Sequence, residues 1–398
     1  MLIENGLVFT EKTGFRPLHI RTGEDRILSL FEKNSSEISG RMKESSEVTV
    51  DASGCYVLPG LTDIHFHGCM GRDFCNEESV SEDIKLLQNL EAIGKYELSK
   101  GVTSICPATM SLPEEMLSAI CRGSALFKHA QETGSYADVA ELVGIHLEGP
   151  FLNTQKKGAQ NGAYLRLPET TLLHKLQEEA GGLIRLVTLA PELDGTLPCI
   201  SECRNLFHFS LGHTDADYDV SMAAFLAGAD HITHLYNAMP PFLHRAPGPI
   251  GAAFDTPECF VELICDGIHN SSSAVRAAFK LFSSSRLVLI SDSMEAAGLS
   301  DGRYRLGGQD VIVKEKTAVL ANGSLAGSVV TLYDCLCNAV SIGIPLEDAV
   351  CAATINPCRS IGIDDLYGSI EIGKKAHFLL LNQKDLSIRK VIKGQFIL

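Results

Sequence analysis

His65 and His67 are separated by a single residue at the end of an apolar run, CYVLPGLTDIHFH. Side chains alternate between the two faces of a strand, so both imidazoles point the same way and can ligate one metal ion. Such a pair alone is weak evidence, because isolated pairs of this kind arise incidentally. The interpretation gains weight from other ionisable residues that close other apolar runs, namely Glu148, His213, His234 and Asp292.

Each of these residues alone has a simpler explanation. A histidine in an apolar run is usually a hydrogen-bonded core residue, and Asp292 could cap the helix that follows it. The whole set is harder to explain that way, because burying polar groups without partners costs several kcal/mol each. A divalent metal would satisfy the ligands jointly and leave Asp292 close enough to handle a proton from metal-bound water. The residues therefore predict a metal-dependent site.

Beyond residue 55 the chain alternates between apolar, β-branched runs and helix-like segments. Near-continuous apolar strands between helices are typical of a parallel sheet covered on both faces. Eight such units over ~250 residues match a (β/α)8 barrel better than an open doubly wound sheet. In a barrel the carboxyl ends of the strands meet at one rim, where enzymes of this fold place their chemistry. The predicted strands lie in 55–67, 101–110, 141–149, 183–192, 206–215, 229–239, 260–270 and 286–294.

Amphipathic stretches between the apolar runs predict the helices of the barrel. Asp215 or Asp217 is expected to cap one helix, and Gly228 to end it, because Asp accepts hydrogen bonds from free N–H groups and glycine tolerates a left-handed end. The expected helices cover 80–99, 114–133, 168–180, 215–227 and 271–284, with two more over 327–342 and 346–355 that close the barrel.

The two ends of the chain read as short strands joined by turns. Residues 1–56 and 366–398 are predicted to form one small β-sandwich domain beside a barrel of residues 57–365. The N-terminal strands are expected to run antiparallel. Their connections are expected to be turns at Asn5-Gly6 and at 23–25 and an exposed polar loop over 33–46.

The composition favours an enzyme with a small substrate. The 398 residues include 34 Lys plus Arg against 49 Asp plus Glu, a formal net charge of −15. This charge repels phosphate backbones and anionic lipid, so we expect no nucleic-acid partner and no membrane partner. No signal peptide and no apolar run of ~20 residues is evident, which predicts a cytoplasmic protein. The 13 cysteines are scattered and odd in number, so we expect reduced, buried thiols.

In seven segments, taken in order, the chain resembles the N-acetylglucosamine-6-phosphate deacetylases of the amidohydrolase superfamily: DIHFHG, GIHLEGPFLN, LGHTDA, THLYNAMPPFLHRAPG, DGIHN, ISDSMEAAG and GSLAGS. The β-rich ends resemble the composite β-sandwich of that family. The resemblance implies a barrel enzyme that removes the N-acetyl group from a hexosamine 6-phosphate and yields the free amine and acetate. It also implies a homodimer, in which His269 could reach the substrate across the interface.

The resemblance also implies roles for single residues. Glu148, His213 and His234 resemble the ligands of the catalytic metal, expected to be zinc or iron, with manganese and cobalt as alternatives. Asp292 resembles the acid/base that takes a proton from the attacking water and returns it to the leaving amine. Arg245 resembles the phosphate-binding arginine, because its fork of N–H donors suits phosphate oxygens. The other implied substrate-binding residues are Ala159, Gln160, Asn237, Ala238, His269, Leu325, Ala326 and Gly327.

Two features depart from the family pattern. Some members lack the paired histidines, whereas His65 and His67 are both present here, so either one or two ions per subunit are expected. Gln160 stands where other members carry a histidine; it can donate a hydrogen bond but cannot be charged.

The alternatives are a deacetylase of N-acetylgalactosamine 6-phosphate, another amidohydrolase, and a non-catalytic barrel scaffold. The last predicts the loss of a ligand or of the acid/base, and none is missing.

Overall fold

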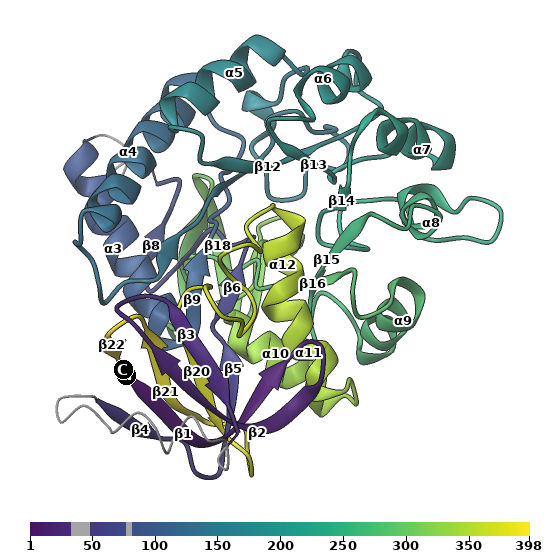
Figure 1. Cartoon of the computed structure of the whole chain (residues 1–398). Coiled ribbons are helices and arrows are strands. Elements are labelled where there is room, and N and C mark those ends of the chain that lie inside the picture. The colour runs from purple at the N-terminus through teal and green to yellow at the C-terminus, as the bar shows by residue number, and fades with distance from the viewer. Residues whose placement is uncertain (33–47, 77–81) are drawn as a thin grey trace.

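The structure, a computed structural model, describes residues 1–32, 48–76 and 82–398 (Figure 1). Strands from the middle of the chain lie inside an arc of helices, and a separate sheet carries both chain ends. The expected polar loop over 33–46 lies outside the described residues. Within the described ranges, no helix is long and apolar enough to cross a membrane.

Six strands form a parallel sheet in chain order. Their residues are buried at almost every position, as expected for strands covered on both faces. The strands are β11 (Ile145–Glu148), β12 (Ile184–Leu189), β13 (His208–Leu211), β14 (His231–Ile232), β15 (Phe260–Ile264) and β16 (Leu287–Ile290).

Three strands form a second parallel sheet in the order β10-β9-β6, with β6 (Leu61–Asp63), β9 (Val102–Ile105) and β10 (Glu141–Leu142). Backbone contacts join it to the six-stranded sheet at both sides. Ala108 pairs in parallel with His146, and the Asp292 N–H donates to the His65 carbonyl at 2.9 Å. All eight predicted strand segments therefore contain a parallel strand, and strands that follow one another in sequence are neighbours in space.

The predicted helices are confirmed, with small shifts of their ends: α3 (Asp83–Ser99), α4 (Glu114–Glu132), α5 (Thr170–Glu179), α7 (Tyr218–Ala227), α9 (Ser272–Phe282), α10 (Leu332–Ser341) and α11 (Leu346–Ala353). Asp217 caps α7, because its side chain accepts from the Val220 N–H at 2.9 Å, and Gly228 ends the helix. Three short helices and one turn of 3-10 helix were not predicted: α6 (Thr196–Cys203), α8 (Gly248–Phe254), α12 (Ile355–Ser360) and η1 (Gly162–Tyr164).

The two chain ends share one sheet, in the order β22-β21-β20-β5-β1-β2-β3, with β4 paired to β1. In Figure 1 the purple N-terminal and yellow C-terminal strands lie side by side, and β5 pairs antiparallel with β20. The strands are β1 (Leu2–Thr10), β2 (Gly14–Thr22), β3 (Ile27–Phe31), β4 (Thr49–Asp51), β5 (Cys55–Pro59), β20 (His377–Asn382), β21 (Ile388–Lys393) and β22 (Phe396–Ile397).

Two expectations for the N-terminal strands were wrong. Asn5-Gly6 makes no turn; β1 runs through it with a register shift, and Asn5 has a φ of 66°. The expected antiparallel pairing is confirmed for β1 with β2 and for β2 with β3, but β4 and β5 pair with β1 in parallel. Close packing explains the glycine inside β1, because a Cβ on Gly6 would lie 2.5 Å from a methyl carbon of Val57 on β5. The expected turn at 23–25 is present, with the Gly23 N–H bonded to the Arg26 carbonyl.

A small antiparallel sheet after β16 was also not predicted. Its strands are β17 (Gly302–Leu306), β18 (Gln309–Lys314) and β19 (Thr317–Leu320), joined by tight turns at Gly307-Gly308 and Glu315-Lys316 with positive φ. A short hairpin of β7 (Gly68–Cys69) and β8 (Arg72–Asp73) follows β6.

All 13 cysteines are free, and all but Cys337 and Cys351 are buried, as expected.

Candidate metal centre and substrate pocket

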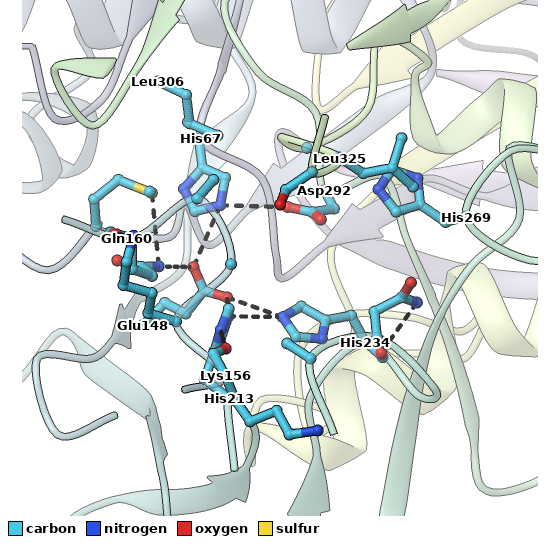
Figure 2. Close-up of a pocket in the computed structure, with 18 of the residues that line it drawn as sticks. His67, Glu148, Lys156, Gln160, His213, His234, His269, Asp292, Leu306 and Leu325 are labelled. Carbon is cyan, nitrogen blue, oxygen red and sulfur yellow. Dashed lines mark hydrogen bonds and ion pairs between the residues drawn. The ribbon is translucent and has the colours of Figure 1, made fainter. Parts of the chain in front are cut away.

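The predicted ligands lie at the carboxyl ends of the parallel strands. Glu148 ends β11, and His213, His234 and Asp292 follow β13, β14 and β16 closely. The last three have φ values of 48°, 28° and 48°. Non-glycine residues rarely adopt this strained conformation, and it concentrates at functional sites. The backbone therefore turns at each strand end and carries the side chain toward the others (Figure 2).

Gly212 lets two of these strand ends approach each other. A Cβ at this position would lie 2.6 Å from the Cβ of Thr233, closer than real contacts allow. Gly212 precedes His213 and Thr233 precedes His234. The absence of a side chain at residue 212 therefore contributes directly to bringing the two imidazoles together.

Glu148, His213 and His234 each bring one ligand atom to a common point. Glu148 Oε1 lies 3.0 Å from His213 Nε2 and 3.2 Å from His234 Nε2, and these two nitrogens are 3.1 Å apart. A tetrahedral ion with bonds of ~2.0–2.2 Å separates its ligand atoms by roughly 3.3–3.6 Å, a few tenths of an ångström more than the spacing here. The spacing of the three buried ligand atoms therefore suits a single divalent cation.

A second group lies next to the first and consists of His65, His67 and Asp292. His67 Nε2 lies 3.3 Å from Asp292 Oδ1, and His65 Nε2 lies 3.8 Å from the same oxygen. Both imidazoles also approach Glu148, at 3.4 Å from Oε1 for His65 and 3.5 Å from Oε2 for His67. Glu148 therefore stands between the two groups.

The outer nitrogen of three imidazoles is held by an oxygen that can only accept. These contacts join His213 Nδ1 to the Lys156 carbonyl at 2.9 Å, His67 Nδ1 to the Ala108 carbonyl at 3.2 Å and His65 Nδ1 to the Glu262 carboxylate at 2.8 Å. Nδ1 must therefore carry the hydrogen, so the neutral ring presents a lone pair at Nε2.

Those inward lone pairs face carboxylate oxygens of Glu148 and Asp292, which present lone pairs as well. The arrangement is favourable only if a cation, either a metal ion or added protons, lies between them. The buried Nε2 of His65 has no hydrogen-bond partner, as expected for an atom aimed at an ion. The donor set therefore fits a divalent metal.

Both carboxylates of the site are held in their ionised form. Burial acts to raise the pKa of Glu148, but the charges of His65 and His213 around it hold that pKa well below its usual range. Burial also opposes ionisation of Asp292. When added protons take the place of an ion, the hydrogen bond donated by protonated His67 and the charge of protonated His65 lower the pKa of Asp292. Asp292 is therefore available as a proton acceptor near neutral pH.

A pocket of about 470 Å³ opens over this site (Figure 2). Its size is ordinary for a small-molecule site. Most residues assigned to the site from the sequence line it: His67, Glu148, Ala159, Gln160, His213, His234, Asn237, Ala238, His269, Asp292, Leu325 and Gly327.

Three of the predicted residues do not line the pocket. His65 is completely buried beneath it, and Ala326 is completely buried behind its neighbours Leu325 and Gly327. Arg245 is exposed on the loop between β14 and α8, where Leu243 and Ala246 form an isolated bridge. Within one chain, the structure therefore does not bring Arg245 to the other site residues.

Glu262 has a place in the site that sequence reasoning missed. Its Oε2 binds His65 and accepts from the His234 N–H at 3.2 Å, so it anchors a residue of each group. The signal was a single carboxylate within the apolar strand FVELI. Other unpredicted residues line the pocket from the loop after β11 and from the segment after β16: Thr154, Gln155, Lys156, Lys157, Gly158, Leu306, Asn322 and Ser324, together with Met110.

Comparison with known proteins is consistent with this geometry. Residues 56–395 match the Amidohydrolase family. The chain is 35% identical, over 99% of its length and 96% of the relative, to N-acetylglucosamine-6-phosphate deacetylase of Bacillus subtilis (strain 168). It is 33% identical, over 85% of its length and 87% of the relative, to N-acetylgalactosamine-6-phosphate deacetylase of Escherichia coli O157:H7.

A solved structure gives the same relationship. N-acetyl-D-glucosamine-6-phosphate deacetylase of Mycobacterium smegmatis, a mutant in complex with N-acetyl-D-glucosamine-6-phosphate, superposes with a TM-score of 0.86 at 30% identity. The match covers 100% of this chain and 98% of that chain. The fold is thus that of the amidohydrolase superfamily, of TIM-barrel type. On sequence, fold and site geometry together, the chain belongs to the amidohydrolase family and is related to its N-acetylglucosamine-6-phosphate deacetylases.

Proposed function

We propose that this protein removes the N-acetyl group from N-acetyl-D-glucosamine 6-phosphate, giving D-glucosamine 6-phosphate and acetate. One observation carries the proposal: Glu148, His213 and His234 converge on one point beside Asp292, at the base of a pocket. The choice of substrate is supported by two similar proteins that are both named N-acetylglucosamine-6-phosphate deacetylase.

We assign one divalent ion to Glu148, His213 and His234, and a second ion to His65, His67 and Asp292 in a two-ion form. Imidazole and carboxylate ligands suit zinc or iron, with manganese and cobalt as alternatives. A bound ion supplies Lewis-acid polarisation of the acetamide carbonyl and lowers the pKa of water beside it.

Asp292 moves the proton in this scheme. Its lowered pKa keeps the carboxylate ionised, so Oδ1 can accept a proton from the attacking water. The protonated side chain then donates to the sugar nitrogen as the C–N bond breaks, because without that proton the nitrogen would have to leave as a strongly basic anion. His67, at 3.3 Å from Oδ1, keeps this carboxylate in place between the two events.

The pocket walls are proposed to hold the sugar and its acetyl group. Leu325 and Gly327 would surround the acetyl methyl, backed by the buried Ala326. His269 is bonded through Nδ1 to Asp266 at 2.7 Å. Burial opposes its positive form, but this bond raises the pKa of His269, which favours contact with an anionic substrate. The remaining proposed contacts in the wall are Ala159, Asn237 and Ala238.

Arg245 is proposed to bind the phosphate in a homodimer. Its exposed loop also carries Phe242 and Leu243, which are 48% and 53% exposed. Exposed apolar residues of this kind support burial against a second copy. The guanidinium of Arg245 would also supply positive charge for the phosphate in a protein whose net charge is −15.

We propose that β6, β9 and β11 to β16 close into one (β/α)8 barrel of residues 57–365. The backbone bonds at both sides of the two parallel sheets support closure. We further propose that residues 1–56 and 366–398 form a separate β-sandwich domain, which the pairing of β5 with β20 supports.

A second candidate substrate is N-acetylgalactosamine 6-phosphate, favoured by the relative from Escherichia coli. Acetate release from a panel of N-acetylated sugars and their 6-phosphates separates the two. We expect the highest kcat/KM with N-acetylglucosamine 6-phosphate and at least tenfold less with the galactose epimer. The reverse order would establish the second candidate, and no acetate from any member, with metal present, would contradict both.

Replacing Asp292 by Asn should remove proton transfer while keeping the shape of the side chain. We expect Asp292→Asn to lose about 10²–10⁴-fold in kcat and to bind substrate with little change. Turnover and substrate binding are measured side by side, with Asp310→Asn as the matched control because its side chain is 90% exposed. Near-normal turnover of Asp292→Asn would contradict the assigned role.

Replacing Arg245 by Ala should weaken recognition of the phosphate alone. A hydrogen bond to a charged group contributes about 1.5–3 kcal/mol, so KM for the phosphorylated sugar should rise roughly 10–100-fold. Activity on the unphosphorylated sugar should be unchanged. Arg389→Ala, an exposed arginine on β21, is the control. Equal losses on both sugars, or no change on either, would overturn the assignment.

A further inference from the structure

We propose that Gln160 is a positioning residue that fixes the Glu148 carboxylate for metal binding, and that it does not contact the sugar. The proposal rests on the proposed metal-dependent function and deepens it. It reassigns a residue whose place in the family pattern suggested substrate binding.

Gln160 is 1% exposed, although it lines the pocket. Its Nε2 donates to Glu148 Oε2 at 2.6 Å, and its Oε1 accepts from the Ser111 backbone N–H at 2.6 Å. A backbone N–H can only donate, so it fixes which end of the amide is oxygen. The NH₂ group must therefore point at Glu148 (Figure 2).

Little of the Gln160 amide remains for a ligand. The same Nε2 lies 3.8 Å from the Met110 sulfur, so both of its hydrogens have an acceptor inside the protein. The backbone is held too, because the Gln160 N–H bonds to the Lys157 carbonyl and Lys157 Nζ donates to the Gln160 carbonyl. A sugar hydroxyl would have to break one of these buried contacts to reach the amide nitrogen.

The bond from Gln160 gives the two carboxylate oxygens of Glu148 different partners. Oε2 is held by Gln160, whereas Oε1 faces His213 and His234 at 3.0 and 3.2 Å. The side-chain amide of Gln160 also keeps its hydrogens whatever the pH or the metal content, whereas the inward nitrogens of the histidines do not. It can therefore hold the carboxylate in a ligating orientation before an ion arrives.

The identity of the side chain matters for charge. A histidine at residue 160 could donate to Glu148 as well, but in its cationic form it would offset the carboxylate charge that attracts the metal. A glutamine stays neutral, so this chain keeps the full charge of Glu148 for the ion. Partners that orient a ligand typically change metal affinity 10–100-fold when removed.

The test measures metal retention without substrate. Full-length protein, isolated with its metal, is dialysed against graded EDTA, and the ions per chain are counted by mass spectrometry. We expect Gln160→Met, which keeps the length and lacks the donor, to lose its metal at a 10–100-fold lower EDTA concentration. Gln160→His, which restores a donor, should retain most of the affinity.

Gln155→Met is the matched control, because Gln155 is an exposed residue of the same loop and pocket. It should retain metal like the unmodified protein. If Gln160→Met does not fold by circular dichroism, Gln160→Leu replaces it. Equal retention by Gln160→Met and the unmodified protein, together with a raised KM, would overturn the proposal in favour of a sugar contact. An unmodified protein that holds no ion would contradict the proposed function itself.

Discussion

The site depends on one electrostatic constraint: lone pairs of histidine nitrogens and of carboxylate oxygens point at each other in a buried space. Glu148 Oε1 lies within 3.4 Å of inward nitrogens of His65, His213 and His234. Without a cation between them, these contacts would be repulsive and the buried charges costly. With one, each ligand is satisfied, and the carboxylate of Asp292 is left ionised beside it.

The fold supplies this arrangement by fixing the outer side of each ligand. Parallel strands end side by side, and strained backbone at His213, His234 and Asp292 turns the side chains into the pocket. The bonds of the outer histidine nitrogens, the carboxylate of Glu262 and the amide of Gln160 then set the direction of each lone pair. Burying these polar groups costs free energy, which the apolar side chains of the buried strands beneath them offset.

Much of this could be predicted from the sequence, because the strands are apolar runs that end in ionisable residues. The pattern placed a parallel strand in each of the eight predicted barrel segments. It also grouped Glu148, His213 and His234 as candidate ligands, because strand ends in such folds share one side. It could not identify contacts that depend on packing between distant segments. Gly6 reads as a turn residue until the approach of Val57 is known, and Gln160 reads as a sugar contact until Ser111 fixes its amide. Arg245 lies outside the pocket of its own chain, so its proposed role would require a second copy, which the sequence of one chain does not describe.

We propose that one ion sits among Glu148 Oε1, His213 Nε2 and His234 Nε2, with Asp292 next to it. Anomalous diffraction from crystals of the active enzyme, recorded on both sides of the absorption edge of its metal, locates the ion directly. We expect a peak at the centre of these three atoms, with or without a second peak between His65 and His67. A peak elsewhere, or none in crystals of enzyme with full activity, would contradict it.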